Sequence, residues 1–162
     1  MKAEAISSFP RAAGAIEELP KLWIEPLYLL DTNVVSELRR LKPHGGLLAW
    51  LRQIADRDLH LSAVSVGEIQ EGVELTRDQD VKQASEIETW LQEVIDTYNV
   101  LPMDAVTFRV WAKLMHRRSE TLLDDGMIAA TALVHGLTVV TRNTRDFKVF
   151  SVPTVNPFEF GR

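Results

Sequence analysis

Short apolar runs that alternate with longer helical stretches constrain the fold of this chain more than any other feature. Five such runs are too short to form a core helix, at residues 27–30, 59–64, 99–103, 137–141 and 152–157. Between most of them, apolar residues recur every three to four positions, which is the spacing of an amphipathic helix. Strands separated by helices pair in parallel, and helices cover both faces of a parallel sheet. We therefore expect an α/β domain with a central, mostly parallel sheet.

The helical stretches and the N-terminal segment define the expected domain organisation. Helices are predicted at residues 32–41, 47–55, 66–75, 81–98, 105–118 and 125–135. The preceding segment is rich in alanine and contains Pro10, Pro20 and Pro26, each of which breaks or bounds a helix. We interpret residues 1–26 as an appendage and residues 27–162 as one domain.

Composition excludes several classes of function. The chain has no cysteine, which rules out a disulfide framework, a thiol nucleophile and a cysteine-based zinc site. Its formal net charge of −5 argues against a broad electrostatic grip on nucleic acid, and leaves room for a local basic strip or a bound cation. No apolar run approaches the ~20 residues that cross a bilayer. We expect a cytoplasmic protein that does not associate with a membrane.

Four acidic residues are predicted to meet at one edge of the sheet. Asp31 directly follows the first strand, Glu68 comes shortly after the second, Asp125 opens the helix that leads into strand 137–141, and Asp146 follows that strand. Open parallel sheets bind their ligands at this carboxyl edge. Because clustered carboxylates resist ionising together, a hard cation such as Mg²⁺ or Mn²⁺ is the natural occupant. Such a site favours phosphodiester hydrolysis, with water activated for attack on phosphorus.

Each acid also has an ordinary structural explanation. Asp, Thr and Asn are favoured N-caps, so Asp31 or either of the two residues after it could simply begin a helix. Ser65 followed by Glu68 has the spacing of a capping box. Asp124 and Asp125 could be a cap and an acid favoured in the first helical turn. Only the coincidence of several acids at one edge favours a site.

Four segments carry a resemblance to a known family. They read LLDTNVVSEL, LSAVSVGEIQEGVEL, DDGMIAATALVHGLTVVTRNTRDF and VNPF, in this order from residue 29 onward. Together they resemble a PIN-domain ribonuclease, in particular the VapC toxins of type II toxin-antitoxin systems and their FitB-like branch. The resemblance implies a three-layer α/β/α sandwich, a Mg²⁺- or Mn²⁺-dependent endoribonuclease, a homodimer and a cognate antitoxin protein.

The resemblance also implies roles for the acids. Asp31, Glu68 and Asp125 match the first three acids of the family and would be metal ligands. At the fourth position, some relatives have an acid where this chain has Asn143, whereas others have Asn there and an acid three residues later. We therefore expect Asp146 to complete the catalytic set.

The polar neighbours of the acids receive supporting roles. Asn143 would hold water, and Thr32 and Asn33 would either position water around the metal or only cap the helix. Arg142 and Arg145 lie beside the expected site and are candidate contacts to RNA phosphates.

The alternative is a binding or regulatory module, either a catalytically silent PIN domain or a phosphorylatable Mg²⁺-binding receiver. A receiver requires an acceptor Asp after a middle strand and a Lys after a late strand. Asp104 follows the run at 99–103, but no Lys follows the strand at 137–141. A silent domain would be expected to lose acids, and this chain keeps a candidate for every position.

Overall fold

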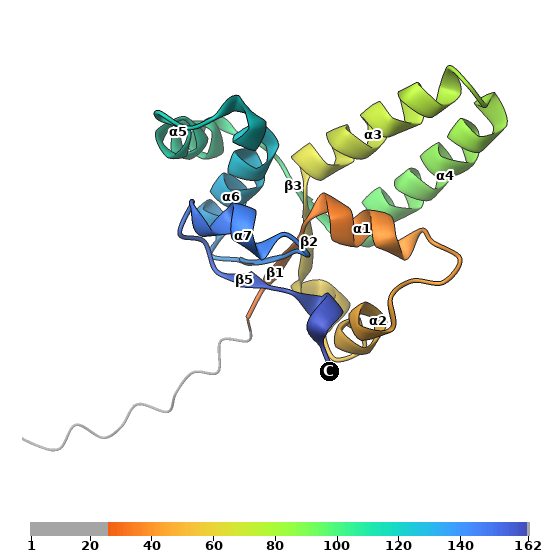
Figure 1. Ribbon diagram of the computed structural model, residues 1–162, viewed down its shortest axis with the longest axis horizontal. Helices are drawn as coiled ribbons and strands as arrows, with labels where there is room; N and C mark the ends of the chain where they lie inside the picture. Colours follow the sequence, from red (N-terminus) through yellow and green to blue (C-terminus); the bar gives the residue numbers. More distant parts are fainter. Residues whose placement is uncertain (1–25, 162) are drawn as a thin grey trace, which may run out of the picture.

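The core of the protein is a five-stranded sheet in which every strand pair is parallel (Figure 1). The computed structural model describes residues 26–161. In the order β3-β2-β1-β4-β5, the strands are Asn99–Leu101, Leu59–Ser62, Tyr28–Leu30, Thr138–Val140 and Thr154–Val155. The expected parallel sheet is confirmed, and β1 lies at its centre. The predicted appendage, apart from Pro26, lies outside the described residues.

Seven α-helices connect and cover the strands within the described part of the chain. They are α1 (Thr32–Leu38), α2 (Gly45–Leu51), α3 (Ala63–Arg77), α4 (Val81–Thr97), α5 (Ala105–Leu114), α6 (Leu123–His135) and α7 (Thr144–Lys148). Short 3₁₀ turns lie at Asp56–Asp58, Glu120–Leu122 and Pro157–Glu159. The sequence did not predict α7, because five residues are too few to display a helical period.

Two hydrophobic cores, one on each face of the sheet, show that the fold is a three-layer sandwich. Leu30 and Val140 point to one face, where α1, α2 and α4 pack. Their neighbours Leu29 and Val139 point to the other, where α6 and α7 pack. This alternation follows from the two-residue period of a strand. Within residues 26–161, none of the helices combines the length and apolar composition needed to span a membrane.

The junction of β2 and α3 differs from the sequence prediction. Strand β2 ends at Ser62, whose hydroxyl accepts the Val64 N–H at 3.2 Å and caps α3. The helix therefore begins at Ala63, two residues before Ser65, and Ser65 is buried in its first turn. The capping-box explanation for Glu68 is wrong, because the N-cap is Ser62 and not Ser65.

Candidate active site

Asp31 is the most buried of the four predicted acids, with 4% of its surface exposed at the carboxyl end of β1. One carboxylate oxygen accepts the Thr32 N–H at 2.8 Å, so Asp31 does cap α1. The other oxygen accepts hydrogen bonds from Asn33 Nδ2 and Thr141 Oγ1, both at 2.7 Å. Burial raises the pKa of Asp31 against the lowering effect of these bonds. Asp31 therefore caps the helix, but its carboxylate is also buried, which is energetically unfavourable. A helix cap does not have to be buried, so capping alone does not explain this position.

Thr141 belongs to this cluster, although no role was predicted for it. Strands β1 and β4 pair with Leu30 opposite Val140, so the next residues in register are Asp31 and Thr141. Thr141 is fully buried, and its hydroxyl also accepts the Asn143 N–H at 2.9 Å. The signal that could have found it is this register, because a polar residue at the carboxyl end of the neighbouring parallel strand must face the acid.

Glu68 lies in α3 and reaches the start of α1 through its side chain. The Thr32 hydroxyl hydrogen-bonds to the Glu68 carboxylate and to Ser65 Oγ, the latter at 2.8 Å. Burial raises the pKa of Glu68, and the charges of Asp124, Asp31 and Asp125 raise it further. Residues that are 36 positions apart in the sequence are therefore neighbours at the carboxyl edge.

Asp125 and Asp146 complete the acidic edge from α6 and α7. Partial burial raises the pKa of Asp125 to about 6, and the nearby carboxylates of Asp31, Asp146 and Asp124 contribute to this rise. Asp146 also raises the pKa of Asp31 by charge repulsion. Asp124 lies in the first turn of α6, whose N-cap position is Leu122, so its interpretation as a cap is wrong. The four acids come from different parts of the chain, and each lies close enough to at least one of the others for their charges to interact.

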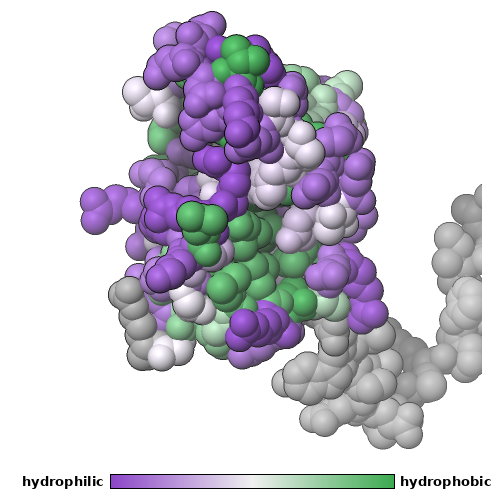
Figure 2. Space-filling view, turned by 90° about the vertical axis from the view of Figure 1, so that its right-hand side faces the viewer, coloured by the Kyte–Doolittle hydropathy of each residue, from purple (hydrophilic) through white to green (hydrophobic). Residues whose placement is uncertain are grey.

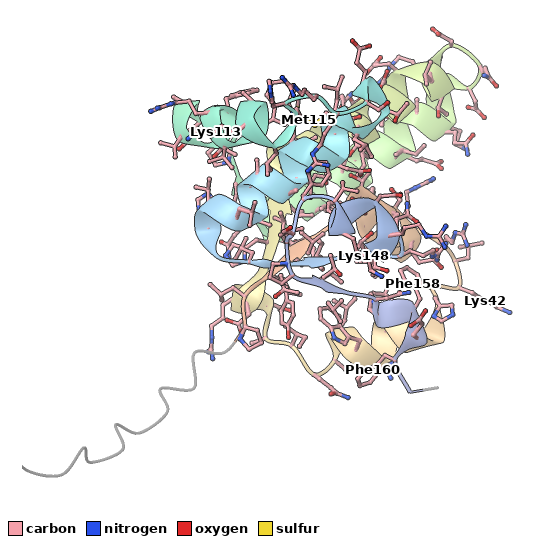
Figure 3. The ribbon with its side chains drawn as sticks, turned by 60° about the vertical axis from the view of Figure 1, so that its left-hand side comes forward. Lys42, Lys113, Met115, Lys148, Phe158 and Phe160 are labelled. Carbon is pink, nitrogen blue, oxygen red and sulfur yellow. The ribbon has the colours of Figure 1, made fainter. Side chains whose placement is uncertain are left out.

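The remaining predicted residues lie around this edge. Asn143 is exposed at the start of α7, and its side chain makes no capping bond. Arg145 is exposed on α7. Arg142 is engaged within the protein, because its guanidinium contacts Glu37 at 3.3 Å and lies 3.9 Å from the centre of the Phe158 ring. Figure 3 shows Lys148 on α7 and Phe158 on the C-terminal turn on the same side of the molecule.

Asp104, the acceptor that a receiver would need, has a structural role instead. It follows β3, which is an edge strand rather than a middle one. Its carboxylate accepts hydrogen bonds from the Thr107 N–H and hydroxyl at 2.9 and 2.8 Å, which cap α5 and lower the pKa of Asp104. The geometry gives no support to the receiver interpretation.

The chemistry of the acidic edge fits a hard divalent cation. All candidate ligands are carboxylate oxygens, whose pKa values are raised by burial and, to a smaller extent, by mutual repulsion, and a bound cation would favour their charged forms. Among residues 26–161, no three acidic, histidine or cysteine side chains are grouped closely enough to hold an ion as they stand. Asp31 is turned toward Thr141 and Glu68 toward Thr32. A cation would therefore require the acidic side chains to come closer together, while the hydrogen bonds that orient Asp31 and Glu68 stay in place.

Comparison with known proteins identifies the family. Residues 28–152 match the family model described as PIN domain. The chain belongs to the PIN-domain family. This PIN domain is 35% identical to the toxin FitB of Neisseria gonorrhoeae over 138 residues, which cover 82% of this chain and 99% of that toxin. It is 36% identical to the VapC ribonuclease Y4jK of Sinorhizobium fredii over 140 residues, with coverage of 82% and 99%.

The fold of this PIN domain is similar to that of solved relatives. It matches the crystal structure of FitAcB from Neisseria gonorrhoeae with a TM-score of 0.73 at 33% identity, over 83% of this chain and 100% of that one. Matches at this identity and coverage confirm the resemblance to PIN domains of the FitB and VapC type.

Proposed function

We propose that this PIN domain is a Mg²⁺- or Mn²⁺-dependent endoribonuclease that acts as the toxin of a toxin-antitoxin pair. The observation that carries the proposal is the mutual charge interaction of Asp31, Glu68, Asp125 and Asp146 at one edge of the sheet. The names of its relatives, a FitB toxin and a VapC ribonuclease, support the same activity.

Asp31, Glu68 and Asp125 would hold the cation, with Asp146 completing the set. A bound Mg²⁺ or Mn²⁺ supplies Lewis-acid activation of water and stabilises charge on the leaving oxygen of the phosphodiester. The chain contributes orientation: Thr141 and Asn33 fix one oxygen of Asp31, and Thr32 holds Glu68. Asp125 is only partly buried and can change its protonation near neutral pH, so it can give up its proton to bind a cation.

The surface supports a protein partner of the antitoxin kind. Figure 2 shows an apolar area on the side of the molecule where the α1–α2 loop lies in Figure 1, bordered by hydrophilic side chains. Leu41 in that loop is fully exposed. Exposed apolar areas with polar borders mark interaction surfaces. A solved relative described as a member of the VapBC family of toxin-antitoxin systems, which is 26% identical to this chain, supports an antitoxin as the partner. The homodimer and the cytoplasmic location stay predictions, and light scattering of the purified protein tests the first.

The test is RNA cleavage by protein purified without an antitoxin. Wild type should cleave RNA in Mn²⁺ or Mg²⁺ and stop when EDTA is added. Asp125→Asn should abolish cleavage. Asp104→Asn is the matched control, because it makes the same change of charge at a helix cap that accepts Asn, and it should leave cleavage intact. Absence of cleavage by folded wild type, together with phosphorylation of Asp104 by acetyl phosphate, would favour the regulatory alternative.

A further inference from the structure

We propose that Glu37 and Arg142 form a clamp, an ion pair that positions Asp31. Both are then positioning residues for the nuclease reaction, so this inference rests on the proposed function. Glu37 lies in α1, one turn after Asn33, so the two side chains share a face of the helix. Only 5% of Glu37 is exposed, although it is a charged residue in a helix whose other buried side chains are valines. A carboxylate buried to this extent requires a specific set of partners.

The partners of Glu37 come from three places in the chain. One oxygen accepts the backbone N–H of His44, the residue that caps α2, at 3.1 Å. The other contacts the guanidinium groups of Arg40 and Arg142, each at 3.3 Å. Of these partners, only Arg142 belongs to the loop after β4 that borders the acidic edge. Glu37 therefore connects α1 and the start of α2 to that loop.

Arg142 is held at both ends. Its guanidinium lies between the Glu37 carboxylate and the face of Phe158, 3.9 Å from the ring centre. Phe158, which is labelled in Figure 3, is itself almost fully buried in the C-terminal turn. At its backbone, the Arg142 N–H donates to Asn33 Oδ1 at 3.2 Å. The side chain of Arg142 thus fixes the place of its own backbone amide.

The backbone amide of Arg142 determines which way the Asn33 side chain points. Because Asn33 Oδ1 accepts from Arg142, its Nδ2 group faces the opposite way, where it donates to Asp31 Oδ2 at 2.7 Å and to Thr141 Oγ1 at 3.2 Å. The hydrogen-bonded path therefore runs from Glu37 through Arg142 and Asn33 to Asp31. Loss of the clamp would free Asn33 to turn and would release one of the donors that orient Asp31.

This geometry argues against Arg142 as a contact to RNA phosphate. To reach a phosphate, Arg142 would have to leave Glu37, and the buried carboxylate would lose one of its two cations. Arg142 itself is half exposed, but the carboxylate that it would leave is buried, and loss of a cation from a buried carboxylate is unfavourable. Within residues 26–161, the Arg145 side chain makes no ion pair or ring contact of this kind, and it remains the candidate for phosphate contact.

The experiment compares Glu37→Gln, Arg142→Ala, the double variant and Arg40→Ala. Mutation of residues that orient metal ligands typically lowers activity about 10- to 100-fold. Each clamp variant should therefore lower kcat by about that factor, while KM changes less than about twofold. The double variant should lose little more than either single one, because both break the same path. Arg40→Ala is the matched control: it removes the other cation from Glu37 without touching the loop, and it should retain kcat.

The alternative role of Arg142, direct contact with RNA phosphate, predicts different kinetics. If Arg142 binds phosphate, Arg142→Ala raises KM and weakens the salt dependence of binding, while Glu37→Gln keeps wild-type kinetics. That result would overturn the clamp. Arg142→Lys keeps the charge but loses the planar group that lies on Phe158, so a clamp predicts a loss of kcat in this variant as well.

A second measurement separates this inference from the proposed function. The side-chain amide signals of Asn33 in ¹⁵N NMR spectra of the metal-free protein report its hydrogen bonds directly. Glu37→Gln and Arg142→Lys should shift these signals, and Arg40→Ala should leave them in place. Unchanged Asn33 signals in the clamp variants would overturn the inference even if wild type cleaves RNA. Shifted signals in a protein that does not cleave RNA would uphold the clamp and refute the nuclease.

Discussion

Asp125→Asn should stabilise the metal-free protein while it removes RNA cleavage. Burial and three neighbouring carboxylates raise the pKa of Asp125 from 3.8 to about 6 in the folded protein. A raised carboxyl pKa means that the folded state favours the proton. Asp125 therefore contributes stability below about pH 4, and this contribution is lost as the pH rises through 6. At pH 7.5 the ionised side chain destabilises the fold, and Asn removes that charge.

The size of the effect follows from the pKa. A rise from 3.8 to about 6 corresponds to about 3 kcal/mol if solvent does not screen the charge. Because Asp125 is only partly buried, screening reduces this figure, and we expect about 1 to 2 kcal/mol. For a chain of this size that is a rise in melting temperature of roughly 2 to 8 °C.

Urea unfolding in EDTA at pH 7.5 and pH 4.5 measures the difference. Asp125→Asn should be more stable than wild type at pH 7.5. The difference in free energy of unfolding between the two proteins should be smaller at pH 4.5. Asp124→Asn is the control, since it removes the same charge from the neighbouring, exposed side chain, and it should change stability less. The electrostatic account of the acidic edge would be refuted if Asp125→Asn is no more stable than wild type at pH 7.5. It would also be refuted if the stability difference between the two proteins does not depend on pH.

Three further predictions concern Glu68, pH and the N-terminal segment. Glu68→Gln should change stability by less than about 1 kcal/mol, because Gln can still accept the Thr32 bond, and should lose RNA cleavage; normal cleavage would reduce the site to three acids. Mn²⁺ affinity, measured by calorimetry, should fall steeply below pH 6, because the cation must displace the proton of Asp125; a flat profile would remove Asp125 from the ligand set. Removal of residues 1–25 should preserve cleavage and melting temperature, because the sheet and all four acids lie downstream; a large drop in melting temperature or loss of a dimer would show that the segment belongs to the fold.

The position of the acids could be predicted because it follows from topology. Asp31 directly follows an apolar run, and a parallel sheet places every strand end and helix start on the same edge. The same rule predicts that Glu68, Asp125 and Asp146 lie at this edge, and it needs no distances to do so. Strand order was not needed for this inference, because all arrangements of parallel strands share that edge.

The supporting roles of Thr141 and Glu37 could not be predicted, because they depend on register and packing. Thr141 matters only because Val140 pairs with Leu30, which the sequence does not state. Glu37 is buried because the loop after β4 and the start of α2 enclose it, and neither contact can be seen in the sequence. Ser62 caps α3 in place of the predicted Ser65, because β2 ends at Ser62, and the sequence pattern does not show where that strand ends.

Binding of Mn²⁺ to the antitoxin-free protein at pH 7.5, followed by calorimetry, tests the central claim most directly. If the acidic edge is a metal site, wild type should bind Mn²⁺. Asp31→Asn and Asp125→Asn should each weaken the affinity by about tenfold or more, because each removes a charged ligand. Asp104→Asn, which changes a helix cap, should bind like wild type. No binding by wild type, or equal binding by all four proteins, would contradict the assignment of a shared metal site to these carboxylates.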